Sequence, residues 1–186
     1  MDAMELLLSR ESALKLEPPG PDRAALDAIF QSAVRAPDHG RLRPWRFVVI
    51  PEEKRAGFGD LMADCMRRRE PDATGEMLQR ERDKAMRAPI IVVAAARVQK
   101  GHKIPEVEQM AAAAAAAQNI MLAANALGYG AMWKTGAPAY DATVKRALGL
   151  EEADDILGFI YLGKQVGGGI QVPRPKAEEF VSVWAG

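Results

Sequence analysis

The stretch that decides the fold is Glu106–Leu127, which reads EVEQMAAAAAAAQNIMLAANAL. It contains neither proline nor glycine, and Ala111–Ala117 is an unbroken alanine run. Alanine has the highest helix propensity, and its small side chain lets neighbouring backbones approach closely. An alanine run can also be low-complexity sequence, but the apolar Ile120-Met121-Leu122 that follows argues against disorder. We therefore predict one long buried central helix, ended by Gly128-Tyr129-Gly130.

Short apolar segments on both sides of this helix predict β-strands. Phe47–Ile50 is rich in β-branched residues, and Ile90–Ala95 is a continuous apolar run typical of a strand buried on both faces. Ala131–Trp133 follows the glycine pair, and Ile156–Gly163 has the character of a core strand. Together these segments predict a small sheet.

Helical spacing predicts helices on both sides of that sheet. One helix carries an apolar stripe from Leu26 to Val34, is capped by Asp22 and stops before Pro37. The other predicted helices are Asp2–Arg10, Glu52–Arg69, Gly75–Arg87 and Ala139–Leu148. The tail from Gly167 onward is rich in glycine and proline and is expected to be extended. The sum is an α+β fold, expected as a single domain over residues 1–186.

The composition argues against several classes of function. The chain has 186 residues, of which 48% are hydrophobic and 27% charged, as in ordinary globular proteins. Its 25 basic and 25 acidic residues balance, so no global field attracts nucleic acid or an anionic membrane. The densest basic run, Arg67–Arg69, is followed at once by Glu70 and Asp72, which is typical of a solvated helical face. We expect neither a nucleic-acid nor a membrane partner.

Cysteine content and hydropathy predict a cytoplasmic protein. Cys65 is the only cysteine, which excludes an internal disulfide and suits a reducing compartment. A small half-buried residue on a helix is a more natural interpretation of Cys65 than a nucleophile. The first residues lack the layout of a signal peptide, and no apolar run approaches the ~18 residues that a membrane helix needs.

The motifs of several kinds of site are missing from the sequence. His39 and His102 are the only histidines and neither belongs to a spaced ligand motif, so no metal site is expected. There is no Gly-x-Ser-x-Gly nucleophile elbow and no phosphate-binding P-loop. Gly128-x-Gly130 follows a helix, whereas the dinucleotide-binding fingerprint follows a strand and opens a helix.

Basic residues stand at the ends of predicted elements, each close in sequence to a hydroxyl or an imidazole. They are Arg10 with Ser12 and Lys15, Arg35 with His39, and Lys134 with Thr135. Phosphate binds best to charge-assisted donors, and a planar ring needs an aromatic or apolar wall, so such a set suits a planar anionic ligand. The alternative is that these residues are ordinary surface bases and caps.

A series of short blocks runs through almost the whole chain. They are Met1–Leu7 leading into Arg10-Glu11-Ser12, Arg35–His39 leading into Pro44-Trp45, Arg87–Ile91, His102–Pro105, Gly128–Ala137 and Gly158–Gly163. In this order and at these separations they resemble the nitroreductase family of FMN-dependent NAD(P)H oxidoreductases, especially its short bacterial branch called YdjA-like. No single block is specific, but their combination is.

The resemblance implies a three-layer α/β/α fold with a small mixed sheet, a long central helix and an extended C-terminal tail that crosses a homodimer. It also implies that FMN lies at the subunit interface. The residues that would line the flavin are Arg10, Glu11, Ser12, Arg35, His39, Trp133, Lys134 and Thr135, with Arg35 supplied by the partner subunit. A segment associated with the nicotinamide nucleotide comprises Ala123, Ala124, Asn125, Ala126, Leu127 and Gly128.

Some positions differ from the family pattern. Glu11 stands where relatives often have a second arginine, which leaves its backbone to make the contact. Arg43 stands at a position that is often glutamine, and Lys15 is offset by one residue from the basic position of larger relatives. Arg174 and Lys176 are similar to a phosphate-contacting pair of longer members.

The function implied by the resemblance is transfer of hydride from NAD(P)H to a nitroaromatic, quinone or similar conjugated acceptor in a ping-pong mechanism. Arg10 and Lys134 are candidates for the phosphate, and Lys15 is the candidate for the positive charge that stabilises the anionic reduced flavin. Because the cofactor performs the chemistry, we predict no catalytic protein residue. A flavin-binding carrier or sensor with little turnover is the alternative, and a dimerisation core without a ligand is a third interpretation.

Overall fold

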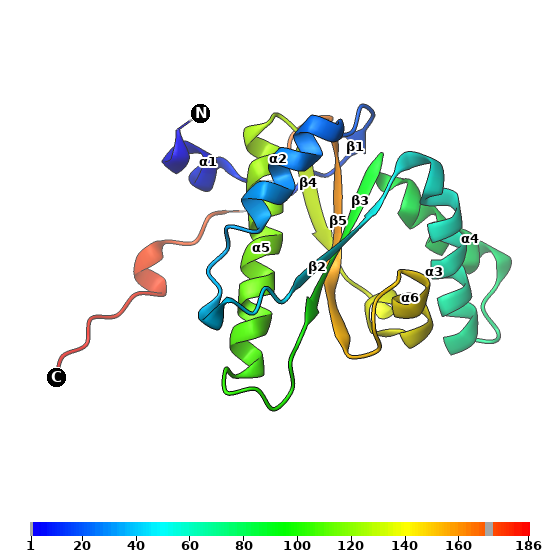
Figure 1. The fold of residues 1–186 in the computed structure, drawn as a ribbon. Helices are drawn as coiled ribbons and strands as arrows, with labels where there is room; N and C mark the ends of the chain where they lie inside the picture. Colours follow the sequence, from blue (N-terminus) through cyan, green and yellow to red (C-terminus); the bar gives the residue numbers. More distant parts are fainter. Residues whose placement is uncertain (1, 170–172) are drawn as a thin grey trace.

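The computed structural model describes residues 2–169 and 173–186. Within these residues, a sheet of five strands lies between two layers of helices (Figure 1). The strands are Leu16–Glu17 (β1), Trp45–Ile50 (β2), Ile90–Arg97 (β3), Gly130–Lys134 (β4) and Asp154–Gln165 (β5). The helices are Ala3–Ser9 (α1), Arg23–Ala33 (α2), Arg55–Arg69 (α3), Gly75–Lys84 (α4), Glu106–Ala126 (α5) and Ala142–Ala147 (α6). Short 3₁₀ turns are His39–Arg41 (η1), Glu52–Lys54 (η2), Ala85–Arg87 (η3), Ala137–Tyr140 (η4) and Ala177–Glu179 (η5).

The two helical layers cover opposite faces of the sheet. Helices α1, α2 and α5 lie on one side, and α3, α4 and α6 lie on the other (Figure 1). The α+β fold and its three layers are therefore confirmed. The expected extended tail is described at residues 173–186, where the one regular element is η5, whereas residues 170–172 lie outside the described residues.

The sheet is antiparallel, and the expectation of a mixed sheet is wrong for the described pairings. Strand β5 pairs with β3 and β4 on opposite edges and with β1 near its end, and β2 continues the sheet beyond β3. Helix α5 connects β3 to β4, and these two strands run in the same direction, as in a parallel crossover. They do not touch, because β5 lies between them and runs antiparallel to both.

Strand β3 is buried on both faces, as its continuous apolar sequence predicted. Ile91, Val93 and Ala95 pack into the core on the α3 side. Val92 and Ala94 pack on the opposite side, against α2 and α5. Alternate side chains of a strand point to opposite faces, so a strand between two helical layers must be apolar at every position.

Helix α5 confirms the prediction of a long buried helix. Its buried residues include the alanine pairs Ala112-Ala113 and Ala116-Ala117, and Ile120 is also fully buried. Small side chains allow α5 to pack closely on α2, where Ile29 and Ala33 belong to the same core cluster. The helix ends at Ala126, and Gly128 takes a positive φ of 85° immediately after it.

The segment predicted as one helix over Ala139–Leu148 is divided in two. Residues Ala137–Tyr140 form the turn η4, and the α-helix begins only at Ala142. The cause is Asp141, whose carboxylate accepts a hydrogen bond from Val144 N at 2.9 Å and so caps the helix at its start. The sequence interpretation missed this cap.

The segment from Arg10 to Glu17 contacts both β4 and the end of β5. Ala13 N donates to the Ala131 carbonyl at 3.0 Å, and Leu16 pairs with Gln165 in β1. The Glu11 carboxylate accepts from Gly169 N at 2.6 Å and from Gln165 Nε2 at 2.9 Å. The start of the chain is therefore held against both β4 and the end of β5.

An irregularity in β5 creates a site for Trp133. Between β3 and β5 the register shifts at Ala94/Ala95, which leaves Leu157 as the extra residue of a β-bulge. The Leu157 carbonyl accepts a hydrogen bond from Trp133 Nε1 at 3.1 Å. The indole lies directly over Gly158, where an added Cβ would stand 2.1 Å from Trp133 Nε1.

We predict that Gly158→Ala lowers the free energy of unfolding by roughly 1–3 kcal/mol, because the new methyl group displaces the indole from its hydrogen bond. The matched control is Gly57→Ala in α3, where an added Cβ meets no atom within 4 Å. That change should raise stability by up to about 1 kcal/mol through helix propensity. Urea unfolding followed by circular dichroism measures both, and equal stabilities of the two variants would contradict the packing argument.

We predict that Glu11→Ala releases Gly169, because the carboxylate is a charged acceptor for that backbone N–H. A hydrogen bond to a charged group contributes about 1.5–3 kcal/mol, so amide exchange at Gly169 should accelerate roughly tenfold or more. Hydrogen exchange read by NMR at Gly169 provides the measurement. Glu17→Ala is the control, since Glu17 forms only the exposed ion pair with Lys15; an unchanged Gly169 rate in Glu11→Ala would refute the anchor.

Candidate functional site

Strand β4 sends its last side chains to two different sides of the sheet. Trp133 packs on the α5 side, against the core cluster that contains Ile160. Lys134 and Thr135 instead line a cavity on the side of α3 and α4. The expected triplet Trp133-Lys134-Thr135 therefore does not form one continuous surface, because Trp133 and Lys134 are consecutive residues of β4 and face opposite ways, whereas Thr135 follows the end of the strand on the side of Lys134.

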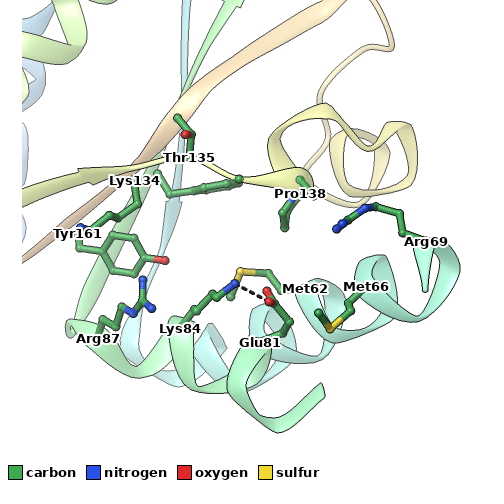
Figure 2. Close-up of a pocket in the computed structure, with 13 residues that line it drawn as sticks. Met62, Met66, Arg69, Glu81, Lys84, Arg87, Lys134, Thr135, Pro138 and Tyr161 are labelled. Carbon is green, nitrogen blue, oxygen red and sulfur yellow. Dashed lines mark hydrogen bonds and ion pairs between the residues drawn. The ribbon is translucent and has the colours of Figure 1, made fainter. Parts of the chain in front are cut away.

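The cavity beside Lys134 has a volume of about 380 Å³ and lies between the sheet and helices α3 and α4 (Figure 2). We call it the α3–α4 cavity. It is lined by Met62, Met66, Arg69, Glu81, Lys84, Arg87, Lys134, Thr135, Gly136, Ala137, Pro138, Phe159 and Tyr161. Residues from two helices, two strands and two turns thus converge on one space.

Positive charge dominates the lining of the α3–α4 cavity. Lys84 Nζ lies 2.5 Å from Glu81 Oε1, so this pair is neutral overall. Arg69 reaches Glu70 at 3.1 Å at the outer end. Arg87 and Lys134 form no ion pair with any residue of the described ranges, and they are the cations available to a ligand.

Tyr161 contributes a polar group to the wall of the α3–α4 cavity. Its side chain is 2% exposed, and Figure 2 shows its hydroxyl pointing into the cavity beside Arg87. Burial raises the pKa of Tyr161 above its ordinary value. The phenol is therefore neutral near pH 7 and keeps a proton that it can donate.

A second cavity of about 360 Å³ lies on the other side of Lys134, and we call it the β1 cavity. Its walls come from residues 13–16, from Met86 and Arg87, and from Met132 and Lys134. Arg87 and Lys134 thus line both cavities and stand between them. Lys15 is at this rim and pairs with Glu17 at 2.5 Å.

A smaller hollow of about 250 Å³ brings two predicted groups of residues together. Arg10 and Glu11 line it from the end of α1, and Asn125 and Gly128 line it from the end of α5. Glu11 uses its carboxylate to hold Gly169, so its backbone is the part left for a ligand. The half-buried Ser12 follows directly and leads into the β1 cavity.

The nicotinamide-associated segment is heterogeneous in exposure. Ala124 is fully buried in the core, and Ala123 packs against the same core cluster. Leu127 is 47% exposed, and Ala126 is also exposed. Asn125 Nδ2 donates to the Tyr129 carbonyl at 2.7 Å, which fixes the turn after α5. Only the exposed end of this segment is accessible to a nucleotide within one chain.

Arg35 and His39 lie away from the residues described so far. His39 Nδ1 lies 2.6 Å from Glu108 Oε2, at the first turn of α5. Arg35 lines a separate hollow of about 300 Å³ with Arg43 and Trp45. Arg35 follows the end of α2 and His39 contacts α5, whereas Lys134 lines the cavity beside α3 and α4. One chain does not bring these two groups together.

The sequence interpretation did not identify several residues that line the α3–α4 cavity. Arg87 and Tyr161 belong to blocks that carried the family resemblance, but neither was assigned a role. Met62 and Lys84 occur in helices interpreted only as packing and solvated elements. Periodicity indicates which helical face is buried, and it does not reveal that two buried faces leave a space between them.

Other chemistries find little support in the structure. Among residues 2–169 and 173–186, no three His, Cys, Asp or Glu side chains are placed to hold a metal ion. No helix in the same ranges combines the length and the apolar character needed to cross a membrane. Cys65 is fully buried, and burial raises the pKa of its thiol, which disfavours the reactive thiolate.

Comparison with known proteins agrees with this architecture. The family model described as "Nitroreductase family" matches residues 7–164. The Escherichia coli K12 protein named "Putative NAD(P)H nitroreductase YdjA" is 36% identical over 183 residues, which cover 98% of this chain and 94% of that protein.

Solved structures show the same fold. A nitroreductase-like family protein from Bacillus cereus superposes with a TM-score of 0.85 at 22% identity, covering 100% of this chain and 97% of the other. A nitroreductase from Desulfovibrio desulfuricans, solved in complex with FMN, gives a TM-score of 0.76 at 25% identity and covers 98% of each chain. With the family match and the close relative, the chain belongs to the nitroreductase family.

Proposed function

We propose that the protein is an FMN-dependent oxidoreductase that takes hydride from NAD(P)H and reduces a nitroaromatic, quinone or similar conjugated acceptor. Family membership supports the reaction class, the name of the E. coli relative contains NAD(P)H, and the D. desulfuricans relative binds FMN. The observation that carries the proposal is the position of Lys134 and Arg87, two cations without an ion-pair partner in the described chain, at the junction of two cavities.

The residues along this edge fit the chemistry of FMN. Arg10 offers a cation for the phosphate, and the exposed glycine turn after α5 leaves room beside it. Lys15, Arg87 and Lys134 supply positive charge around the β1 cavity, which suits the electron-rich edge of a reduced ring. Met132 forms an apolar wall in the same cavity. Positive charge and apolar surface thus occur together in the β1 cavity and in the smaller hollow beside Arg10.

Bound FMN would supply the redox chemistry, accepting hydride from NAD(P)H and passing electrons to the acceptor in ping-pong order. The protein residues would orient the bound FMN and stabilise its negative charge. Lys134 and Arg87 favour negative charge at the junction of the cavities, and Met86 and Met132 exclude water from the β1 cavity. The end of α5 at Asn125–Gly128 is the proposed contact for the nicotinamide nucleotide. No catalytic acid or base of the protein is proposed.

A second copy of the chain would complete the site. Arg35 and His39 are on the helical layer opposite to Lys134, so the partner's copy of Arg35 is the one proposed to reach the flavin. Helix α1 has no buried residue, and its Leu8 is 72% exposed. Trp184 in the tail is 89% exposed. Apolar surfaces of this kind on both ends of the chain support a homodimer in which they are covered.

We predict that Arg10→Ala and Lys134→Ala each weaken FMN binding about tenfold or more, because each removes a charge-assisted contact. Titration of the flavin-free protein with FMN, followed by flavin fluorescence, gives the dissociation constants. Lys100→Ala, which removes an exposed lysine that lines none of the four hollows described above, is the control and should bind FMN like the unchanged protein. Light scattering should find a dimer in all four proteins.

Mixing the FMN-loaded protein with NADH or NADPH in a stopped-flow instrument separates the enzyme from a carrier or sensor. A fast, concentration-dependent loss of flavin absorbance supports the enzyme. If bound FMN is not reduced by either nucleotide, the carrier or sensor is the better description. If the protein does not bind added FMN at all, the proposal is wrong.

A further inference from the structure

The α3–α4 cavity contains a polar group for which the fold itself has no use. Tyr161 is 2% exposed as a residue, and its hydroxyl forms no hydrogen bond with any described residue; because no buried side-chain oxygen of the described residues lacks a partner, this hydroxyl is the accessible part of the side chain. A hydroxyl that is open to a cavity bonds to water there and can exchange that water for a ligand. The hydroxyl faces the cavity, as Figure 2 shows, so it is available to a molecule bound there.

The charges of the residues that line the cavity indicate which kind of molecule it would bind. An ordinary phenol is already protonated near pH 7, and burial raises the pKa of Tyr161 further, so its hydroxyl can donate a hydrogen bond. Arg87 and Lys134 line the same cavity without an acidic partner in the described chain, and the acid Glu81 is occupied by Lys84. Two free cations and a neutral donor together recognise an anionic oxygen group such as a carboxylate.

The other residues that line the cavity favour a ligand with a flat apolar ring system. Met62, Met66, Pro138 and Phe159 contribute apolar surface, and methionine adapts its shape to aromatic rings. The volume of about 380 Å³ is near the lower end of the range of roughly 300–1,000 Å³ for small-molecule sites. A molecule with one or two rings fits these limits.

We propose that the α3–α4 cavity is the acceptor pocket and that it selects aromatic acceptors carrying a carboxylate, which the Tyr161 hydroxyl, Arg87 and Lys134 hold. The inference rests on the proposed function, since Lys134 and Arg87 also line the β1 cavity assigned to the flavin. It adds the acceptor class and gives Tyr161 the role of a residue that determines specificity.

The binding test uses benzoate, with benzyl alcohol as the neutral probe of the same shape. Isothermal titration calorimetry on the FMN-loaded protein should find benzoate binding at least about tenfold tighter than benzyl alcohol. Tyr161→Phe should weaken benzoate about tenfold and leave benzyl alcohol within twofold. Tyr140→Phe is the matched control, because Tyr140 is 79% exposed and does not line the cavity, and it should change neither affinity.

The catalytic test compares 4-nitrobenzoate with nitrobenzene as acceptors. In the unchanged protein kcat/KM should favour 4-nitrobenzoate, and Tyr161→Phe should reduce that preference about tenfold through KM. The rate at which NAD(P)H reduces the bound FMN should not change, which separates the acceptor pocket from the flavin site. Arg69→Gln at the outer end of the cavity is a second variant and should lower the carboxylate preference about twofold to fivefold.

Equal affinities for benzoate and benzyl alcohol, or an equal loss of both probes in Tyr161→Phe, would overturn the proposal. Normal FMN reduction by NAD(P)H with no preference for the acceptor that carries a carboxylate would disprove the proposed acceptor pocket and leave the proposed function intact. A protein that binds benzoate through Tyr161 but does not bind FMN would retain an anion pocket and disprove the proposed function.

Discussion

Strand β5 is the constraint on which the rest of the structure depends. It hydrogen-bonds to β3 on one edge and to β4 on the other, and its end also pairs with β1. Its backbone groups are therefore satisfied on both sides, as a strand buried between helices requires. The same pairings bring three distant parts of the chain together: the segment after α1, the end of β4 and the turn η3 before β3. The α3–α4 cavity and the β1 cavity are both lined by residues of β4, which β5 holds in place.

The two-residue period of the strands then decides where chemistry can occur. Trp133 turns to the α5 side and is fixed there by the Leu157 carbonyl that the β-bulge provides. Lys134 turns to the α3 side and enters the space between two cavities. Trp133 therefore secures the end of the strand on which Lys134, its neighbour in sequence, reaches the cavities.

Local sequence predicted the elements well and their relations less well. The alanine run predicted α5, the continuous apolar run predicted β3, and Asp22 predicted the start of α2. These predictions succeeded because helix propensity and capping depend on residues that are close in sequence. The sheet direction was mistaken, since nothing in β3 or β4 indicates that β5 will insert between them. Lys134 and Arg10 were found as bases at element ends. Tyr161 was missed, because strand periodicity predicts burial but not that a hydroxyl will face a void.

The division of cations between the two helical layers determines what one chain can do alone. Lys134 and Arg87 face α3 and α4, whereas Arg35 and His39 lie beyond α5. A rigid sheet and the 21-residue helix α5 separate the two groups, so no side-chain rotation can join them. A ligand that needs both groups must contact two molecules, and the exposed apolar residues of α1 and the tail lie where such a partner would gain most from burial. The proposed homodimer would answer both needs, because a second copy of the chain would bring the other group of cations and cover the exposed apolar residues.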